Sequence, residues 1–343
     1  MSEAPPFWFQ KPGLAAWALS PVGMLYGAVT ARRMMQDSGV ISTIPVLCIG
    51  NFITGGAGKT PTAIAIAKIA RDLGLRPGFL SRGYGGSITK PTVVDIKTHN
   101  AKDVGDEPLI LGLYGITVVS ADRPAGASIL AEQGIDIIIM DDGFQNPSLH
   151  KDYSLAVVDA TRGIGNGFCM PAGPLRAPLK PQLAQANAIL LIGKSKAGTN
   201  VVRRAAKMAK PILEAQIVAR HQKQWQEERV LAYAGIADPN KFYRSLESVG
   251  AVVVETRNFH DHHPFSTEEC QELLAQANSQ DLTLVTTEKD SVRLIRSGDI
   301  QQELRAASKV LTVDLHFENK KMVEVIIRDT LKRAAEYRLS KKS

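Results

Sequence analysis

A glycine-rich segment at residues 50–61, with the sequence GNFITGGAGKTP, constrains the fold of this chain more than any other feature. It follows the apolar run 45–49 and precedes an amphipathic segment that begins at Pro61. Between a strand and a helix, glycines let backbone N–H groups converge on phosphate oxygens, and the helix N-terminus adds its positive end. The segment therefore predicts a phosphate-binding loop in an α/β fold.

Within this loop we expect Lys59 to reach the transferred phosphate and Thr60 to bind Mg²⁺. The common G-x-x-x-x-G-K-[ST] pattern has glycine where this chain has Ile53, and Gly55 and Gly56 are expected to supply the missing flexibility. The alternative interpretation is a glycine-rich turn with an incidental lysine. The expected nucleotide-binding residues are Ile53, Thr54, Gly55, Gly56, Ala57, Gly58, Lys59 and Thr60.

Short apolar runs alternate with helical patterns along most of the chain, which indicates parallel β-α-β units covered by helices. We therefore predict an α/β fold that is P-loop NTPase-like, with a mostly parallel sheet. Strands are expected at 46–50, 78–81, 92–96, 116–120, 135–140, 155–159, 189–192, 230–234, 252–255, 282–286 and 310–313. Helices are expected at 61–73, 124–133, 241–249, 267–277 and 320–337.

The domain organisation follows from length and from one irregular stretch. A chain of 343 residues predicts about two domains. The Gly- and Pro-rich stretch 163–181 carries little periodicity, which favours a junction near residue 185. We therefore expect an N-terminal apolar membrane-associating segment at 1–43, a phosphate-loop core at 44–185, and a second, smaller α/β part at 186–343 that completes the cleft.

Charge and cysteine content narrow the class of protein. The 41 basic and 34 acidic residues give a net charge of +7, which favours an anionic partner such as a phosphorylated metabolite, a lipid surface or nucleic acid. Most of this excess lies in the segment 320–343, which has the apolar spacing of a helix and is either packed on the sheet or bound to a partner. The three cysteines lack C-x-x-C spacing, which argues against disulfides and a zinc site.

The N-terminal segment 14–29 is mostly apolar, but it is shorter than the roughly 20 residues of a bilayer span, and Pro21 and Gly23 interrupt it. It also lacks the basic start and the cleavage site of a signal peptide. We expect an interfacial membrane segment anchored by aromatic residues. The alternative is a helix packed on the core of the protein. The expected anchors are Phe7, Trp8, Phe9 and Trp17.

Acidic residues at the ends of expected elements are candidates for metal binding and proton transfer. Asp141 and Asp142 follow the apolar strand 137–140, where a carboxylate can hold Mg²⁺. Asp106 lies at an expected helix start, and a histidine beside it would make a base for a hydroxyl proton. The string FHDHHPF at 259–265 supplies histidines, which are alternatively solvated or capping groups. Zinc binding by this string is disfavoured because neighbouring side chains of an extended segment point to opposite sides.

Several loops offer cations for a phosphate or a phosphorylated sugar. The string SRGYGG contributes Arg82 and Tyr84, PLR contributes Arg176, and TEKD at 287–290 adds a mixed cluster. Each loop is individually a weak signal, and a solvated loop is the alternative.

In combination, these strings resemble the tetraacyldisaccharide 4'-kinases of lipid A biosynthesis. The resemblance covers most of the chain in order and rests on several strings specific to that family. They are VLCIGNFITGGAGKTPT, FLSRGYGG, VGDEP, SADR, IIIMDDGFQN, MPAGPLR, FHDHHPF and LVTTEKDSVR.

The resemblance implies transfer of the ATP γ-phosphoryl group, with Mg²⁺, to the 4'-hydroxyl of a membrane-embedded tetraacylated glucosamine disaccharide 1-phosphate. The expected place is the cytoplasmic face of the inner membrane, with peripheral or monotopic attachment and without nucleic acid or an obligate protein partner. Asp106 resembles the catalytic base and His262 its partner. Lys59 and Thr60 serve the phosphates and Mg²⁺. The resemblance also places acids near the metal at Asp141 and Asp142, and cleft residues at Arg82, Tyr84, Arg123 and Arg176.

Two departures and two alternatives accompany this interpretation. Ala177 replaces a common glutamate, and Asn146-Pro147 replaces a common His-Arg, which puts one contact at each point in doubt.

A phosphate-loop GTPase is one alternative, but the chain lacks N-K-x-D and D-x-x-G strings at the expected places. A non-catalytic membrane-binding or nucleic-acid-binding module is the other, but no aromatic platform with interleaved basic residues occurs.

Overall fold

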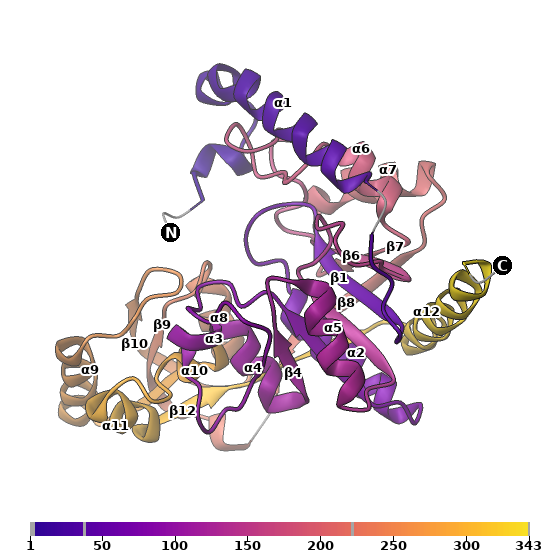
Figure 1. The fold of residues 1–343 in the computed structure, drawn as a ribbon. Coiled ribbons are helices and arrows are strands. Elements are labelled where there is room, and N and C mark those ends of the chain that lie inside the picture. Colours follow the sequence, from indigo (N-terminus) through magenta and orange to yellow (C-terminus); the bar gives the residue numbers. More distant parts are fainter. Residues whose placement is uncertain (1–3, 37–38, 221–222, 342–343) are drawn as a thin grey trace.

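The structure is a computed structural model that describes residues 4–36, 39–220 and 223–341. Within these residues the strands form a nine-stranded sheet and a four-stranded sheet. Helices flank both sheets, and the long helix α1 (Leu14–Met34) lies at one end of the molecule (Figure 1). The predicted α/β fold is confirmed.

The larger sheet is mostly parallel, with antiparallel pairs only at its two ends in the described chain, β13 with β8 and β3 with β4. Its strands in spatial order are β13 (Val313–Phe317), β8 (Ile212–Ala219), β7 (Ala188–Ile192), β6 (Tyr153–Asp159), β1 (Val46–Asn51), β5 (Ile137–Asp141), β2 (Pro77–Ser81), β4 (Thr117–Val119) and β3 (Thr92–Val93). The smaller sheet is parallel in the order β10 (Val252–Asn258), β9 (Arg229–Ala234), β11 (Thr283–Thr287) and β12 (Ser308–Leu311).

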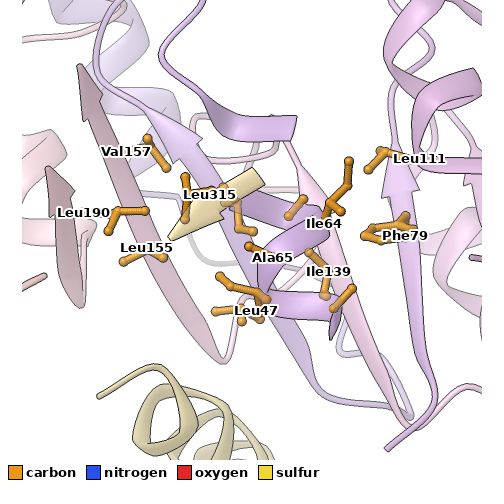
Figure 2. Packing of buried hydrophobic residues seen from close by; sticks show 14 of the residues in the cluster. Leu47, Ile64, Ala65, Phe79, Leu111, Ile139, Leu155, Val157, Leu190 and Leu315 are labelled. Carbon is orange, nitrogen blue, oxygen red and sulfur yellow. The ribbon is translucent and has the colours of Figure 1, made fainter. Parts of the chain in front are cut away.

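Helices cover both faces of the larger sheet, which explains why its central strands are apolar along their whole length. On one face, Ile64 and Ala65 pack among strand residues such as Leu47 and Ile139 (Figure 2). Besides α1, the helices of the described chain are α2 (Lys59–Asp72), α3 (Ala101–Val104), α4 (Asp106–Tyr114), α5 (Arg123–Glu132), α6 (Leu179–Gln185), α7 (Thr199–Lys207), α8 (Pro239–Ser248), α9 (Thr267–Gln280), α10 (Glu288–Arg293), α11 (Asp299–Ala307) and α12 (Lys320–Ser340). Short 3-10 helices occupy Pro6–Phe9, Lys196–Gly198 and Lys223–Trp225.

The apolar runs predict the buried strands well and the exposed ones poorly. Strand β8 was not predicted, because Glu214 and Gln216 interrupt its apolar pattern and much of it is exposed. The single strand expected at 310–313 is instead the end of β12 and the start of β13. The chain leaves the smaller sheet and joins the larger one at this point, which no local pattern indicates.

The division at residue 185 stays a prediction, but the sheets show how the strands are shared. Strands β7, β8 and β13 belong to the same sheet as β1, although they follow residue 185. The smaller sheet contains only strands between residues 229 and 311 of the described chain. A division drawn by sheet would therefore place 229–311 in the smaller unit.

Helix α1 continues through Pro21 and packs one side on the protein. Gly23 and Gly27 face the loop around Cys169, where added Cβ atoms would approach Cys169 within 3 Å. Trp17 is 59% exposed, whereas Trp8 is buried and its indole Nε1–H donates to the Pro171 carbonyl at 2.9 Å. The expected anchor at Trp8 is therefore wrong, because its ring packs inside the protein.

The C-terminal helix α12 packs on the larger sheet. Val323, Ile326 and Ile327 are buried in the same core as the strand residues. Val325, another apolar residue of this helix, is exposed. Packing of this helix on the sheet, with a solvated basic face, is the arrangement that the structure shows.

Candidate active site

The predicted phosphate loop joins β1 to α2, and α2 begins at Lys59. Gly55 has φ +103° and Gly58 has φ +86°, values that strain residues with a side chain. A Cβ on Gly58 would also lie 2.6 Å from Cδ1 of Ile192. These glycines leave an open loop of backbone at the positive end of a helix, which is a favourable site for phosphate. The side chain of Ile53 is buried in the core, where its backbone bridges to Leu175.

The end of β5 places a carboxylate beside the loop. Strands β1 and β5 are neighbours, and the Thr60 hydroxyl donates to Asp141 Oδ2 at 3.4 Å. The other oxygen, Asp141 Oδ1, is buried and accepts no hydrogen bond from the described residues. Burial raises the pKa of Asp141 to about 7. A buried carboxylate oxygen without a donor, next to a threonine hydroxyl, is an oxygen set that fits Mg²⁺.

The neighbouring Asp142 is an anion held by two cations. Arg176 donates to its two oxygens at 2.6 and 3.0 Å, and the Lys59 ammonium lies 3.6 Å away. Burial opposes ionisation, but Lys59 and Arg176 outweigh it and hold the pKa of Asp142 well below its usual range. Two adjacent carboxyls therefore differ in environment, one toward the threonine and one toward the cations.

The second half of the site is built around Asp106, the first residue of α4. Asp106 Oδ2 lies 2.9 Å from Nδ1 of His262 and accepts a 2.6 Å hydrogen bond from Nε of Arg293. Burial would raise the pKa of Asp106, but the hydrogen bond from His262 and the Arg293 charge lower it below its usual value. Both donors end on Oδ2, which leaves Oδ1 for a substrate hydroxyl. A carboxylate of this kind can position that hydroxyl and accept its proton.

The side chain of Arg293, the last residue of α10, is held by hydrogen bonds within α10 and to the smaller sheet. Its Nη1 donates to Asp290 Oδ1 and to the Gly235 carbonyl, each at 2.7 Å. The Gly235 N–H donates to the same Asp290 oxygen at 3.0 Å. Through these hydrogen bonds, Arg293 links Asp106 at the start of α4 to Gly235, which follows strand β9 of the smaller sheet.

One cavity of about 1850 Å³ brings these parts together. Its lining includes the loop residues from Thr54 to Thr60, both acids at the end of β5, and His262. Asp106 itself does not line the cavity, whereas its neighbour Glu107 does. The four expected cleft residues line it too: Arg82, Tyr84, Arg123 and Arg176. Arg123 is 1% exposed and its Nη1 donates to the Ser120 carbonyl at 3.2 Å.

The HDHH string does not gather around one point. His262 contacts Asp106, whereas His263 contacts Glu269, with Nε2 at 2.8 and 2.9 Å from its oxygens. Among the described residues no group of three or more His, Cys, Asp or Glu is arranged to hold a metal ion. All three cysteines are free and buried.

Sequence reasoning did not single out Arg293. It lies three residues after Asp290 within the string LVTTEKDSVR, so the string itself was the available signal. A short helix, α10, turns the Arg293 side chain toward a carboxylate that is 187 positions away in the chain. Spacing alone does not reveal such a contact.

We expect Gly105→Ala to impair turnover, because Gly105 immediately precedes Asp106. Gly105 has φ +89°, and an added Cβ would lie 2.5 Å from the Tyr84 carbonyl. Steady-state kinetics should show a lower kcat, and thermal unfolding a loss of about 1–3 kcal/mol. Gly74→Ala is the control, since Gly74 has φ +82° with nothing within 4 Å of the added atom. Normal turnover in Gly105→Ala would contradict this role of the glycine.

Comparisons with known proteins indicate one family. The sequence profile of the family LpxK, tetraacyldisaccharide-1-P 4'-kinase, matches residues 15–332. The tetraacyldisaccharide 4'-kinase of Agrobacterium fabrum is 50% identical over 327 residues, 95% of this chain and 94% of that protein. The enzyme of that name from Rhizobium meliloti is 49% identical over 339 residues, 99% of this chain and 98% of that protein.

The fold is also that of a solved structure. The "apo" form of LpxK from Aquifex aeolicus, crystallised in complex with ATP, matches with a TM-score of 0.72 at 22% identity, over 93% of this chain and 100% of that chain. The likeness confirms the fold, and the family profile spans nearly the whole chain. The resemblance seen in the sequence is thus confirmed, and this chain belongs to the tetraacyldisaccharide 4'-kinase family.

Proposed function

We propose that this chain transfers the γ-phosphoryl group of ATP to the 4'-hydroxyl of tetraacyldisaccharide 1-phosphate, a step of lipid A biosynthesis. The observation that carries the proposal is one cavity lined by the phosphate loop and by His262, the partner of Asp106. Membership of the kinase family and the ATP complex of the Aquifex aeolicus protein agree with it.

In this proposal Asp106 accepts the proton of the 4'-hydroxyl on Oδ1 while His262 and Arg293 hold Oδ2. Lys59 binds the transferred phosphoryl group, and its charge is stabilising where negative charge accumulates. Mg²⁺ held by Thr60 and an acid of β5 would supply further charge neutralisation when bound. The hydroxyl oxygen forms the new P–O bond as the bond to ADP breaks.

The direct test uses the full chain, labelled ATP, Mg²⁺ and detergent-dispersed tetraacyldisaccharide 1-phosphate. We expect a labelled bisphosphorylated lipid that depends on all three. GTP preference without stimulation by the lipid would instead favour the GTPase alternative.

We further propose that α1 lies in the interface of the inner membrane, on its cytoplasmic side where ATP is available. By length and composition α1 is able to cross a membrane, but its Gly23 and Gly27 side packs on the protein. Its other side exposes large apolar residues, which favours a helix lying in the interface. These exposed residues are Leu14, Trp17, Val22, Met24, Leu25, Tyr26 and Val29.

A basic surface beside α1 supports the same orientation. Helices α6 and α7, together with Lys210 just after α7, carry five basic residues and no acid. Helix α6 begins beside α1, because a Cβ added at Gly27 would lie 3.3 Å from Cδ of Pro178, and α6 and α7 appear at the same end of the molecule as α1 in Figure 1. Lys210, just after α7, donates to the Ala184 carbonyl of α6 at 3.2 Å, so the end of α7 lies close to α6. Such a surface favours contact with anionic headgroups.

We expect Trp17→Glu to weaken binding to vesicles of any charge, because it places a carboxylate on the apolar side of α1. Arg204→Glu should weaken binding only to vesicles with anionic lipid, by about fivefold or more, since each basic residue contributes about 1 kcal/mol there. Vesicle flotation at low and high salt measures both effects. Arg305→Glu on α11, far from α1 in Figure 1, is the charge-matched control. Equal loss in both arginine variants would remove α7 from the membrane surface.

A further inference from the structure

Lys289, in the TEKD string, lies at the junction of both halves of the site. Its ammonium is 3.0 Å from Glu107 Oε1, 3.5 Å from Asp261 Oδ1 and 3.2 Å from Nε2 of His262. The side chain is mostly buried, with 22% of it exposed. The proposed phosphoryl transfer does not itself use this lysine.

Lys289 is charged in this environment. Burial disfavours the ammonium, but the carboxylates of Glu107 and Asp261 outweigh burial and raise the pKa of Lys289 above its usual value. An ammonium has three donors and no acceptor. At 3.2 Å it can therefore bond to Nε2 of His262 only if that nitrogen carries no proton.

The contact on the other side of the ring agrees with this assignment. Nδ1 of His262 lies 2.9 Å from Asp106 Oδ2, which accepts but does not donate when ionised. Nδ1 must then carry the proton of a neutral ring. The competing acceptor for an Nε2 proton is Asp261 Oδ2, at 3.8 Å, which is too far for a hydrogen bond.

The groups that face His262 come from four segments. Helix α4 supplies Asp106 and Glu107, and α10 supplies Lys289 and Arg293. The loop of His262 itself supplies Asp261, and the ring of Tyr84 lies 6.4 Å away, edge to face. The cation that lies nearest to Nε2 in the described chain is Lys289.

We propose that Lys289 is a positioning residue that holds His262 as the neutral Nδ1–H tautomer. In that tautomer His262 donates to Asp106 and orients it, but does not take a proton from it. The proton of the substrate hydroxyl then stays on Asp106 until product leaves. This proposal rests on the proposed function for its consequence in turnover, but the tautomer itself is measurable without substrate.

The test is the ring ¹⁵N spectrum of the full chain labelled at histidine, in detergent, with the His262 signals assigned by their loss in His262→Gln. We expect one protonated nitrogen, Nδ1, and one unprotonated nitrogen, Nε2. In Lys289→Met, where the ammonium no longer donates to Nε2, we expect a proton on Nε2. Lys309→Met, which removes a lysine paired with Glu228 in the smaller sheet, should leave the spectrum unchanged.

Kinetics give the second readout. The acid limb of the kcat profile of Lys289→Met should move to higher pH by about one to three units, the usual effect of one charge within 4–6 Å. At a pH on that limb, kcat should fall about tenfold or more, with KM for ATP unchanged. Lys289→Arg, which keeps a charged donor, should retain the parent tautomer and profile.

Three outcomes would overturn the proposal. They are an Nε2–H tautomer in the parent chain, a doubly protonated His262 at neutral pH, and an unchanged ring spectrum in Lys289→Met. If Lys289→Met fails to fold, the parent spectrum and that of Lys289→Arg decide the question. A chain that shows the expected tautomer but phosphorylates no lipid would contradict the proposed function and not this assignment.

Discussion

Asp106→Asn is expected to reduce kcat by about 10²- to 10⁴-fold, the usual contribution of a general base. The amide has nearly the shape of the carboxylate but cannot accept the hydroxyl proton. The change lies on α4, outside the predicted phosphate loop, so the Kd for ATP should stay close to that of the parent chain. Labelled-lipid turnover and nucleotide binding measure the two quantities separately.

The matched control is Asp103→Asn, three positions earlier. Asp103 closes the capping box of α3 with Asn100, and its Oδ2 accepts from the Asn100 N–H at 2.8 Å. An amide keeps an acceptor at that position, so this variant should retain turnover. Near-normal kcat in Asp106→Asn would remove Asp106 from the role of base, whereas a large loss of ATP binding would indicate a distorted fold instead.

The sequence predicted those parts of the fold that are written in continuous stretches. Buried central strands such as β1 and β5 are uninterrupted apolar runs, and the phosphate loop is one string of residues. Strand β13, at the edge of the larger sheet beside β8, was predicted only at its first residue, as the end of the strand expected at 310–313. Edge strands are partly exposed, so polar residues interrupt their apolar periodicity.

The candidate site was predictable where a family string carries it. Asp106 and His262 are 156 positions apart, and only the resemblance paired them before the structure brought them to 2.9 Å. Local sequence patterns could not pair them, because Asp106 begins helix α4, whereas His262 lies in the loop that follows strand β10 of the smaller sheet. Lys289 and Arg293 were left without assigned roles for the same reason. Their partners are fixed by how the two sheets pack and not by sequence spacing.

Arg293→Met is expected to destabilise the folded chain by about 3–5 kcal/mol, the usual cost of leaving a buried charge without its partner. The Arg293 side chain is 4% exposed, and it contacts two carboxylates, Asp106 and Asp290. Methionine fills similar space but donates no hydrogen bond, so both carboxylates and the Gly235 carbonyl lose a donor. Urea unfolding of the full chain measures the loss.

Arg296→Met is the control, because Arg296 also links the N-terminal and C-terminal halves of the chain but lies outside the buried network. Nη1 of Arg296 donates to the Lys97 carbonyl at 2.7 Å, also linking residues of the C-terminal and N-terminal halves, but it is exposed and its acceptor is neutral. Water replaces such a donor, so we expect a change within about 0.5 kcal/mol. If both variants lose the same stability, contact between the halves is the cause. A loss confined to Arg293→Met, with kcat reduced as well, would show that the charge on Arg293 both stabilises the junction and holds Asp106 in place.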